Sequence, residues 1–233
     1  MKRLLAAALV LAITFPASWF VSRSRTFQLF GEIVPRVEME RRLVALTFDD
    51  GPRAAALPEI LEPLAQNGVQ ATFFLCGAQM EEQPGVAEAL VAAGHELGNH
   101  SWSHRRMVLK SPAFIAGEIE KTDALIRAAG HQGTIHFRAP YGKKLLLLPW
   151  YLQRRGRIHV TWDVEPESDP AIDADAARIA EHVLERVRPG SIILLHPWYG
   201  ARENTRKALP AIVEGLRARG YELVTVSELL RHR

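Results

Sequence analysis

The stretch Leu43-Val44-Ala45-Leu46-Thr47-Phe48-Asp49-Asp50-Gly51-Pro52 decides the fold. Residues 43–48 form a short apolar run of the kind found in buried parallel strands. Two adjacent carboxylates follow, and they repel each other unless a cation lies near them. Gly51-Pro52 then turns the chain away from the strand. A solvated Asp-Asp-Gly turn is the simpler interpretation, so this stretch alone leaves its function open.

Six further apolar runs resemble strands, and helical stripes separate them. Leu57, Ile60, Leu61 and Leu64, for example, are spaced at i, i+3, i+4 and i+7, which predicts a helix. Strands that alternate with helices indicate an α/β fold with a parallel sheet. Seven strands around one core favour a closed barrel, although the pattern also allows an open sheet. The six runs are Ala71–Cys76, Glu96–Asn99, Thr134–Phe137, Ile158–Trp162, Ser191–Leu195 and Glu222–Thr225.

The N-terminus predicts a segment outside the folded domain. Residues 4–21 are apolar except for Thr14 and Ser18, and as a helix they would span about 27 Å, close to the ~30 Å hydrocarbon core of a bilayer. A signal peptide and an uncleaved membrane anchor both fit, whereas a buried helix of the domain would show a stripe. We expect residues 1–25 to be this leader, residues 26–40 a linker and residues 41–233 the domain. The domain is then exported to the cell envelope or periplasm, anchored in the inner membrane, or secreted.

The charge of the chain fits this division. There are 29 Lys and Arg against 26 Asp and Glu, a formal charge of +3, which on its own suggests an anionic partner. Residues 1–25 hold four of the basic residues (Lys2, Arg3, Arg23 and Arg25) and no acid, so 25 basic residues face 26 acidic ones in the remainder. Nucleic acid is therefore not expected as a partner. The single cysteine, Cys76, excludes an intramolecular disulfide and a cysteine-based zinc cluster.

Two histidines follow the predicted strand at Glu96–Asn99. His100 and His104 are four residues apart, so one helical turn would place both on one side. Two neutral imidazoles and one carboxylate make a three-ligand site with open positions for water, as in catalytic metal centres. Capping or surface histidines are the alternative, and this spacing alone does not decide between them.

Polar residues also end three later strands. Arg138 could hold a catalytic carboxylate ionised, or it could form a structural ion pair. One carboxylate of the dense run at 163–169 could orient a histidine. His196 is either a satisfied core group or an acid or base at the mouth of the fold. Because the C-terminal ends of parallel strands meet at one face of an α/β barrel, these candidates are expected to come together.

Taken in order, these segments resemble the polysaccharide deacetylase family, the NodB-homology domain of carbohydrate esterase family 4. The resemblance runs from about Leu43 to Leu230, and its first three motifs are specific. The matching stretches are Thr47-Phe48-Asp49-Asp50-Gly51-Pro52, His100-Ser101-Trp102-Ser103-His104, Arg138-Ala139-Pro140-Tyr141 and Leu194-Leu195-His196.

The resemblance implies a distorted (β/α) barrel, often of seven strands, and a role for each motif residue. Asp49 would be the general base, with Arg138 as its partner, and His196 would be the general acid. The backbone N–H of Tyr141 would help a metal to stabilise the oxyanion. That divalent metal, usually Zn²⁺, with Co²⁺ or Ni²⁺ as alternatives, would be held by Asp50, His100 and His104.

Two segments depart from the family pattern. The fourth motif is usually Asp-x-x-Asp-Trp, whereas residues 165–169 here are Glu-Pro-Glu-Ser-Asp. A carboxylate of this motif tunes the acid histidine in the family, so Glu165, or Asp169 after a one-residue slip, is expected to do so here. Pro197 replaces a common aspartate, and the aromatic residues after it either stack on a sugar ring or cap the barrel. The expected substrate-binding residues are Pro140, Tyr141, Trp198 and Tyr199.

The resemblance implies a metal-dependent hydrolase that removes N-acetyl groups from N-acetylhexosamine units of an envelope or extracellular glycan. An O-acetyl esterase or a small-amide hydrolase would use the same metal centre, and the altered fourth motif keeps both open. A non-catalytic glycan-binding relative is a further alternative. Such a ligand set also binds iron in oxygenases, but the additional Asp49 argues against that. The expected partner is an acetylated glycan, with the membrane as a second one if the leader is retained; the oligomeric state stays open.

Overall fold

The computed structural model describes residue 16 and residues 18–233, and residues 18–23 are helical. Most of the predicted signal peptide or anchor, residues 1–15 and 17, lies outside the described residues. Within the described part of the chain, no helix combines the length and the apolar composition that are needed to span a membrane.

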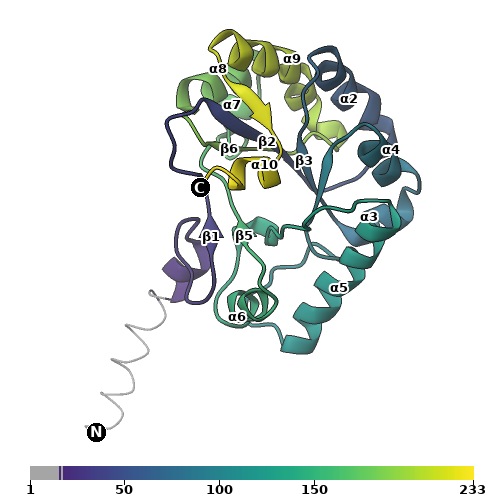
Figure 1. The fold of residues 1–233 in the computed structure, drawn as a ribbon, viewed down its shortest axis with the longest axis vertical. Coiled ribbons are helices and arrows are strands. Elements are labelled where there is room, and N and C mark those ends of the chain that lie inside the picture. Colours follow the sequence, from purple (N-terminus) through teal and green to yellow (C-terminus); the bar gives the residue numbers. More distant parts are fainter. Residues whose placement is uncertain (1–15, 17) are drawn as a thin grey trace, which may run out of the picture.

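The fold is built on the predicted first strand, β2 (Leu43–Asp49), which is buried along its whole length (Figure 1). β2 pairs in parallel with three strands. β6 lies along one side of it, while β3 and β7 share the other side, β3 against its C-terminal half and β7 against its N-terminal half. β4 extends the sheet beyond β3. The bounds of these strands are Thr72–Leu75 (β3), Glu96–Asn99 (β4), Ile192–Leu195 (β6) and Glu222–Val224 (β7).

A second, two-stranded parallel sheet consists of β1 (Ile33–Val34) and β5 (His159–Val160). Phe137 joins it to the larger sheet, because this residue bridges both Asn99 and His159, and beyond β5 an isolated bridge pairs Val164 with Ile193. The α/β fold and the parallel sheet are confirmed. The expectation was a distorted seven-stranded (β/α) barrel; the described strands form a five-stranded and a two-stranded sheet linked by bridges, so a seven-stranded barrel is not clearly formed.

The predicted strand at 134–137 is reduced to the one paired residue, Phe137. The chain leaves the sheet just after it. The N–H of Ala139 donates to the His159 imidazole at 3.3 Å instead of to a backbone carbonyl, and Pro140 has no N–H to donate. The other six predicted runs all contain strands: Glu96–Asn99 has the predicted bounds, the first run is extended by Asp49, and the remaining four are shortened at one or both ends.

Helices cover the outside of the larger sheet (Figure 1). Ile60 and Leu64 of α2 are buried, as their spacing predicts, in a core cluster that also contains Phe48 and Phe73 of the sheet. The helices are α2 (Leu57–Gln66), α3 (Gly77–Glu82), α4 (Val86–Ala92), α5 (Pro112–Ala128), α6 (Leu147–Arg154), α7 (Pro170–Asp173), α8 (Ala176–Arg186), α9 (Glu203–Ala218) and α10 (Val226–Leu230), with 3-10 turns η1 (Ala54–Ala56), η2 (Pro140–Gly142) and η3 (Gly200–Arg202).

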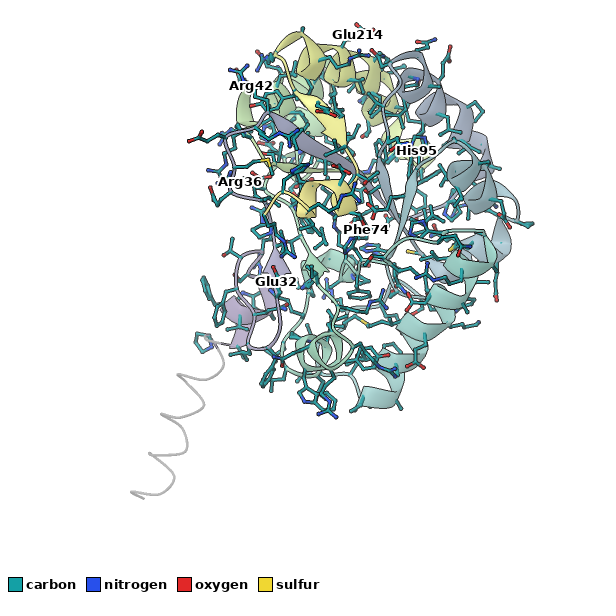
Figure 2. The ribbon with its side chains drawn as sticks, in the orientation of Figure 1. Glu32, Arg36, Arg42, Phe74, His95 and Glu214 are labelled. Atoms are coloured by element: carbon teal, nitrogen blue, oxygen red, sulfur yellow. The ribbon has the colours of Figure 1, made fainter. Side chains whose placement is uncertain are left out.

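A second apolar cluster fills the space enclosed by the two sheets. It includes Val34, Ala45, Phe74 and Val160, which come from β1, β2, β3 and β5. Phe74 is fully buried and lies in the middle of the molecule (Figure 2). The strand ends that surround this cluster are therefore held in fixed relative positions.

Residues 26–40, predicted as a linker, instead belong to the fold. They contain β1, and the Val37 N–H donates to the Gly190 carbonyl at 3.0 Å while the Gly190 N–H donates to Leu43 at 2.8 Å. Gly190 has a φ of +80°, and a Cβ at this position would overlap the carbonyl oxygen of Val37. A glycine is therefore required for residues 33–37 to approach the start of β6.

We expect Gly190→Ala to destabilise the protein strongly, because the added methyl group collides with backbone that cannot move without breaking these hydrogen bonds. Gly68→Ala is the matched control, since Gly68 also has positive φ (+61°) but has nothing within 4 Å of a Cβ. Urea unfolding should show a loss of unfolding free energy at least about 2 kcal/mol larger for Gly190→Ala than for Gly68→Ala. Equal losses would show that residues 33–37 are not tied to the domain.

Candidate metal centre and active site

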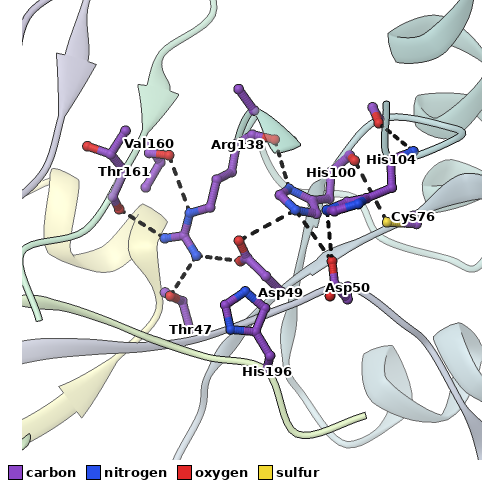
Figure 3. Close-up of polar contacts among 12 residues, drawn as sticks. Thr47, Asp49, Asp50, Cys76, His100, His104, Arg138, Val160, Thr161 and His196 are labelled. Atoms are coloured by element: carbon purple, nitrogen blue, oxygen red, sulfur yellow. Dashed lines mark hydrogen bonds and ion pairs between the residues drawn. The ribbon is translucent and has the colours of Figure 1, made fainter. Parts of the chain in front are cut away.

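The predicted site residues meet where several strands end. Asp49 ends β2 and Asp50 follows it, His100 follows β4, Arg138 follows the bridge at Phe137, and His196 follows β6. Figure 3 shows these side chains converging on one another. A cavity of about 390 Å³ opens onto Asp49, Asp50, His100, His104, Tyr141 and His196.

Asp50, His100 and His104 are arranged to hold a metal ion. One ligand atom of each lies within 4.8 Å of the others. Oδ1 of Asp50 is 3.1 Å from Nε2 of His104 and 3.7 Å from Nε2 of His100. This oxygen is buried and has no hydrogen-bond partner within the described residues, which a bound cation would supply. The donor set of one carboxylate and two imidazoles fits a divalent metal with open positions for water and substrate.

The second nitrogen of His100 fixes the direction of its ring. Nδ1 lies 2.9 Å from the backbone carbonyl of Arg138, so Nε2 points at Asp50. A backbone partner of this kind sets the tautomer and orientation of a metal-binding histidine.

The segment between the two histidines is not the helical turn that their spacing predicts. Ser101 and His104 have positive φ values of 68° and 55°, which an α-helix excludes. Asn99 Oδ1 accepts from the Ser101 N–H at 2.8 Å, and Ser101 Oγ accepts from the His104 N–H at 3.2 Å. These side-chain hydrogen bonds close a loop that returns His104 to the side of His100, so the correct pairing arises from a different conformation.

The protonation states of the ligands suit metal binding. Burial raises the pKa of Asp50, but the contact with His104 and the charges of His100 and His196 outweigh it and lower the pKa to about 2. Burial lowers the pKa of His100 to about 4. At neutral pH, Asp50 is therefore an anion and His100 a neutral imidazole, the forms in which both bind metals.

Asp49 is held by Arg138, as the resemblance implies. Both side chains are almost completely buried, and Nη1 of Arg138 donates to Oδ1 of Asp49 at 2.5 Å. The other oxygen of Asp49 lies 3.6 Å from Nε2 of His100. Asp49 thus presents a carboxylate oxygen beside the metal site while its charge is balanced by Arg138.

The partner of His196 is Glu167, and not Glu165 or Asp169 as predicted. Nδ1 of His196 lies 2.5 Å from Oε2 of Glu167. Oε1 of Glu167 accepts from the backbone N–H of His196 at 3.1 Å and from the hydroxyl of Thr205 at 2.5 Å. Glu165 instead lines the cavity without a hydrogen bond or ion pair to the described residues, and Asp169 caps α7.

Glu167 keeps His196 protonated. Burial lowers the pKa of His196, but the hydrogen bond and charge of Glu167, together with the charges of Asp49 and Asp50, outweigh it and raise the pKa to about 9. With Nδ1 occupied by Glu167, a protonated His196 can donate from Nε2. The sequence carries no signal that separates Glu167 from its acidic neighbours, because the turn at 165–169 decides which of them faces His196.

Tyr141 lies at the mouth of the cavity, in a conformation that is rare for residues other than glycine. Its φ and ψ are 58° and 13°, its side chain is exposed, and its ring centroid is 4.7 Å from that of His104. Pro140 before it is buried. Trp162, which the sequence did not single out, also lines the cavity and packs under Gly142. Tyr141 and Trp162 are therefore the aromatic rings available to a sugar.

Trp198 is not available to a substrate, contrary to the prediction. It is 2% exposed, belongs to the main core cluster, and lies so close to Gly51 that a Cβ there would be 2.5 Å from its ring. Tyr199 is half-buried, and its hydroxyl accepts from the Gln79 amide at 2.8 Å. Of the two interpretations of these aromatic residues, the structure supports capping of the fold.

Comparison with known proteins agrees with this site. The family model described as polysaccharide deacetylase matches residues 36–157. A chitooligosaccharide deacetylase from a Bradyrhizobium strain is 35% identical over 202 residues, which cover 81% of this chain and 90% of that protein. The chain therefore belongs to the polysaccharide deacetylase family, carbohydrate esterase family 4.

Two further relatives show the range of the family. A peptidoglycan-N-acetylglucosamine deacetylase from Bacillus cereus is 33% identical over 190 residues, 81% of this chain and 68% of that protein. A crystal structure of a family 4 pseudoenzyme from Bacillus anthracis has a TM-score of 0.75 and 29% identity, and it covers 86% of this chain and 69% of that one. Because the fold also occurs in a pseudoenzyme, the site residues and not the fold decide whether a member of the family is active.

We expect the protein to bind one divalent metal ion at Asp50, His100 and His104. With Zn²⁺ as the probe, His104→Ala should weaken binding more than about 100-fold, because it removes a direct ligand. His182→Ala is the control, since His182 lines a separate cavity. Competition with a chromophoric chelator measures both affinities, and equal affinities for the two variants would place the metal elsewhere.

Proposed function

We propose that the protein is a metal-dependent hydrolase that removes N-acetyl groups from N-acetylhexosamine units of a glycan. One observation carries the proposal: a carboxylate paired with a guanidinium and a protonated imidazole open onto the same cavity as the metal site. The carboxylate is Asp49, held by Arg138, and the imidazole is His196, held by Glu167. This is the pairing of a base and an acid that amide hydrolysis requires.

The metal, when bound, polarises the acetamide carbonyl and lowers the pKa of water. We propose Zn²⁺ as that metal, with Co²⁺ or Ni²⁺ as alternatives, because two imidazoles and a carboxylate suit these ions. Asp49 accepts the proton of the attacking water. Arg138 cannot take this proton from Asp49, since a guanidinium has no acceptor site, and it keeps the carboxylate oriented throughout.

The remaining steps fall to His196 and Tyr141. An amine anion is a very poor leaving group, so the amide nitrogen must receive a proton as the C–N bond breaks. His196 donates that proton from Nε2, while Glu167 stabilises its charged form beforehand. The backbone N–H of Tyr141 is proposed to stabilise the negative charge on the former carbonyl oxygen. The products are acetate and a free amine.

The names of the relatives support an N-acetylglucosamine-containing glycan as substrate, since one acts on chitooligosaccharides and another on peptidoglycan. For the location we propose the cell envelope or the extracellular space, because residues 4–21 form an apolar run of the kind found in signal peptides and membrane anchors. Acetate release from N-acetylglucosamine oligomers, measured beside release from acetylated xylan, tests the substrate class. Release from xylan alone would replace the proposed amidase with an esterase.

We expect Asp49→Asn to lower kcat by roughly 10²–10⁴-fold on N-acetylglucosamine oligomers, because an amide cannot accept the proton of water. Zn²⁺ affinity, measured in the same preparation, should change far less than in His104→Ala, since Asp49 is not one of the three ligands. Full activity in Asp49→Asn would disprove the proposed base. A complete loss of Zn²⁺ binding in this variant would instead identify Asp49 as a metal ligand.

We expect Glu167→Gln to move the alkaline limb of the kcat/KM profile to lower pH. The acid must be protonated, so activity falls as pH rises through the pKa of His196, which is about 9. Removing the carboxylate brings this pKa down toward its ordinary value of about 6.5. The limb should shift by at least about one pH unit.

Glu165→Gln is the matched control for this experiment. It removes the same charge from the same motif, but Glu165 makes no hydrogen bond to His196 within the described chain, so the limb should stay in place. A shift in Glu165→Gln and none in Glu167→Gln would restore the assignment that the sequence suggested.

A further inference from the structure

A second cavity, of about 520 Å³, opens beside the first. The two cavities share Tyr141, Trp162 and Glu165 as lining residues, so a ligand can extend from one into the other. The lining that belongs to the second cavity alone is positive: it consists of Arg23, Arg25 and Lys143, which we call the cationic annex.

The two arginines of the annex lie on a segment that is docked firmly against the domain. Lys144 is fully buried, and its ammonium group donates to the carbonyl of Val21 at 3.1 Å and to that of Ser24. The hydroxyl of Thr161 donates to the carbonyl of Arg25 at 2.7 Å. These buried contacts hold Arg23 and Arg25 beside the cavity.

The cations of the annex have no carboxylate of the described chain within ion-pair distance, although Arg25 also lines a neighbouring cavity with Asp163 and Glu185. Arg23, Arg25 and Lys143 form no ion pair within the part of the chain that the structure describes. Their contacts are with the faces of aromatic rings: Arg23 and Lys143 lie 5.2 and 5.3 Å from the centroid of Trp19, and Arg25 lies 5.7 Å from that of Trp162. Three cations therefore face a single carboxylate in this cavity, Glu165.

The charges around Lys143 act on it in one direction. The pKa of Lys143 is lowered, first by burial and then by the charges of Arg23 and Arg106. Arg106 approaches from another element, with its guanidinium 5.2 Å from the centroid of the Tyr141 ring. Three cations that line one cavity attract an anion to it.

We infer that the substrate is an anionic glycan, with a carboxylate or phosphate group that lies in the cationic annex while an acetylated sugar occupies the neighbouring site cavity. The inference rests on the proposed deacetylase function and narrows its substrate class. A neutral oligosaccharide would leave the annex without a counter-charge. Arginine and lysine bind both anions, so the geometry does not favour one of them.

Steady-state kinetics on the full-length chain tests the inference with four tetrasaccharides. The neutral reference is the β-1,4-linked N-acetylglucosamine tetramer. The carboxylate probe alternates N-acetylglucosamine with peptide-free N-acetylmuramic acid, and the same compound with its carboxylates amidated controls for shape. The phosphate probe is the N-acetylglucosamine tetramer phosphorylated at a terminal 6-hydroxyl group.

We expect Arg23→Gln/Arg25→Gln to lose the preference for charge. For each enzyme, the KM of the preferred anionic probe is divided by the KM of its amidated or unphosphorylated counterpart. This ratio should be about tenfold higher in the variant than in wild type. The variant's kcat for the anionic probe should change only as much as its kcat for the neutral substrates. The wild-type preference should also shrink as salt is added. Arg154→Gln/Arg178→Gln removes the same charge from exposed positions that line neither cavity, and it should keep the preference.

The inference is overturned if wild type has the same KM for charged and neutral counterparts. It is overturned as well if the two double variants show the same change in KM. It is also overturned if Arg23→Gln/Arg25→Gln loses binding to phosphatidylglycerol vesicles with no change in KM, which would assign the annex to a lipid headgroup. Failure of the proposed function looks different, because no probe would then release acetate. In that case the dissociation constants of the four probes, measured by calorimetry, still decide whether the annex binds anions.

Discussion

The contact between Arg138 and Asp49 is the interaction on which the rest of the site depends. Nη1 of Arg138 donates to Asp49 and to Thr47 of β2, while Nε and Nη2 donate to the carbonyls of Val160 and Thr161. Arg138 lies where the chain leaves the single bridge at Phe137. One guanidinium therefore joins the central strand to the smaller sheet at a point where the backbone ladder has only one pair.

The same residue also orients the metal site through its backbone. The Arg138 carbonyl fixes Nδ1 of His100, and the Arg138 N–H donates to the carbonyl of Asn99 at 3.0 Å. A lysine could make the same backbone contacts, but it could not replace the side-chain ones, because an ammonium group lacks the planar fork that reaches two carbonyls and a carboxylate at once. A buried ion pair often adds little to the free energy of unfolding, because both charges lose their hydration. The pair between Arg138 and Asp49 serves instead to position the groups around it. It holds the base, a metal ligand and two strands in one arrangement.

The sequence predicts those parts of the site that strands position. β2, β4 and β6 lie where apolar runs indicate them, and the residues just after them converge because parallel strands end at one edge. The parts that loops position were predicted less well. His104 reaches its place through positive φ values and not through a helix, and Glu167 replaces Glu165 because of a turn. Trp198 is buried because Gly51 leaves room for its ring. Such packing depends on distant residues that no local pattern reveals.

The charge of the N-terminal residues has a different meaning once the fold is known. By sequence, Lys2, Arg3, Arg23 and Arg25 form one basic group that suits a membrane leader. Arg23 and Arg25, however, line a cavity that continues into the site, on a segment held by Lys144. The catalytic groups come from strand ends, whereas these cations come from a segment that precedes the first strand. On the proposed binding of an anion, the charge preference of the site is set by the chain that leads into the fold, and not by the strand ends that carry the base and the acid.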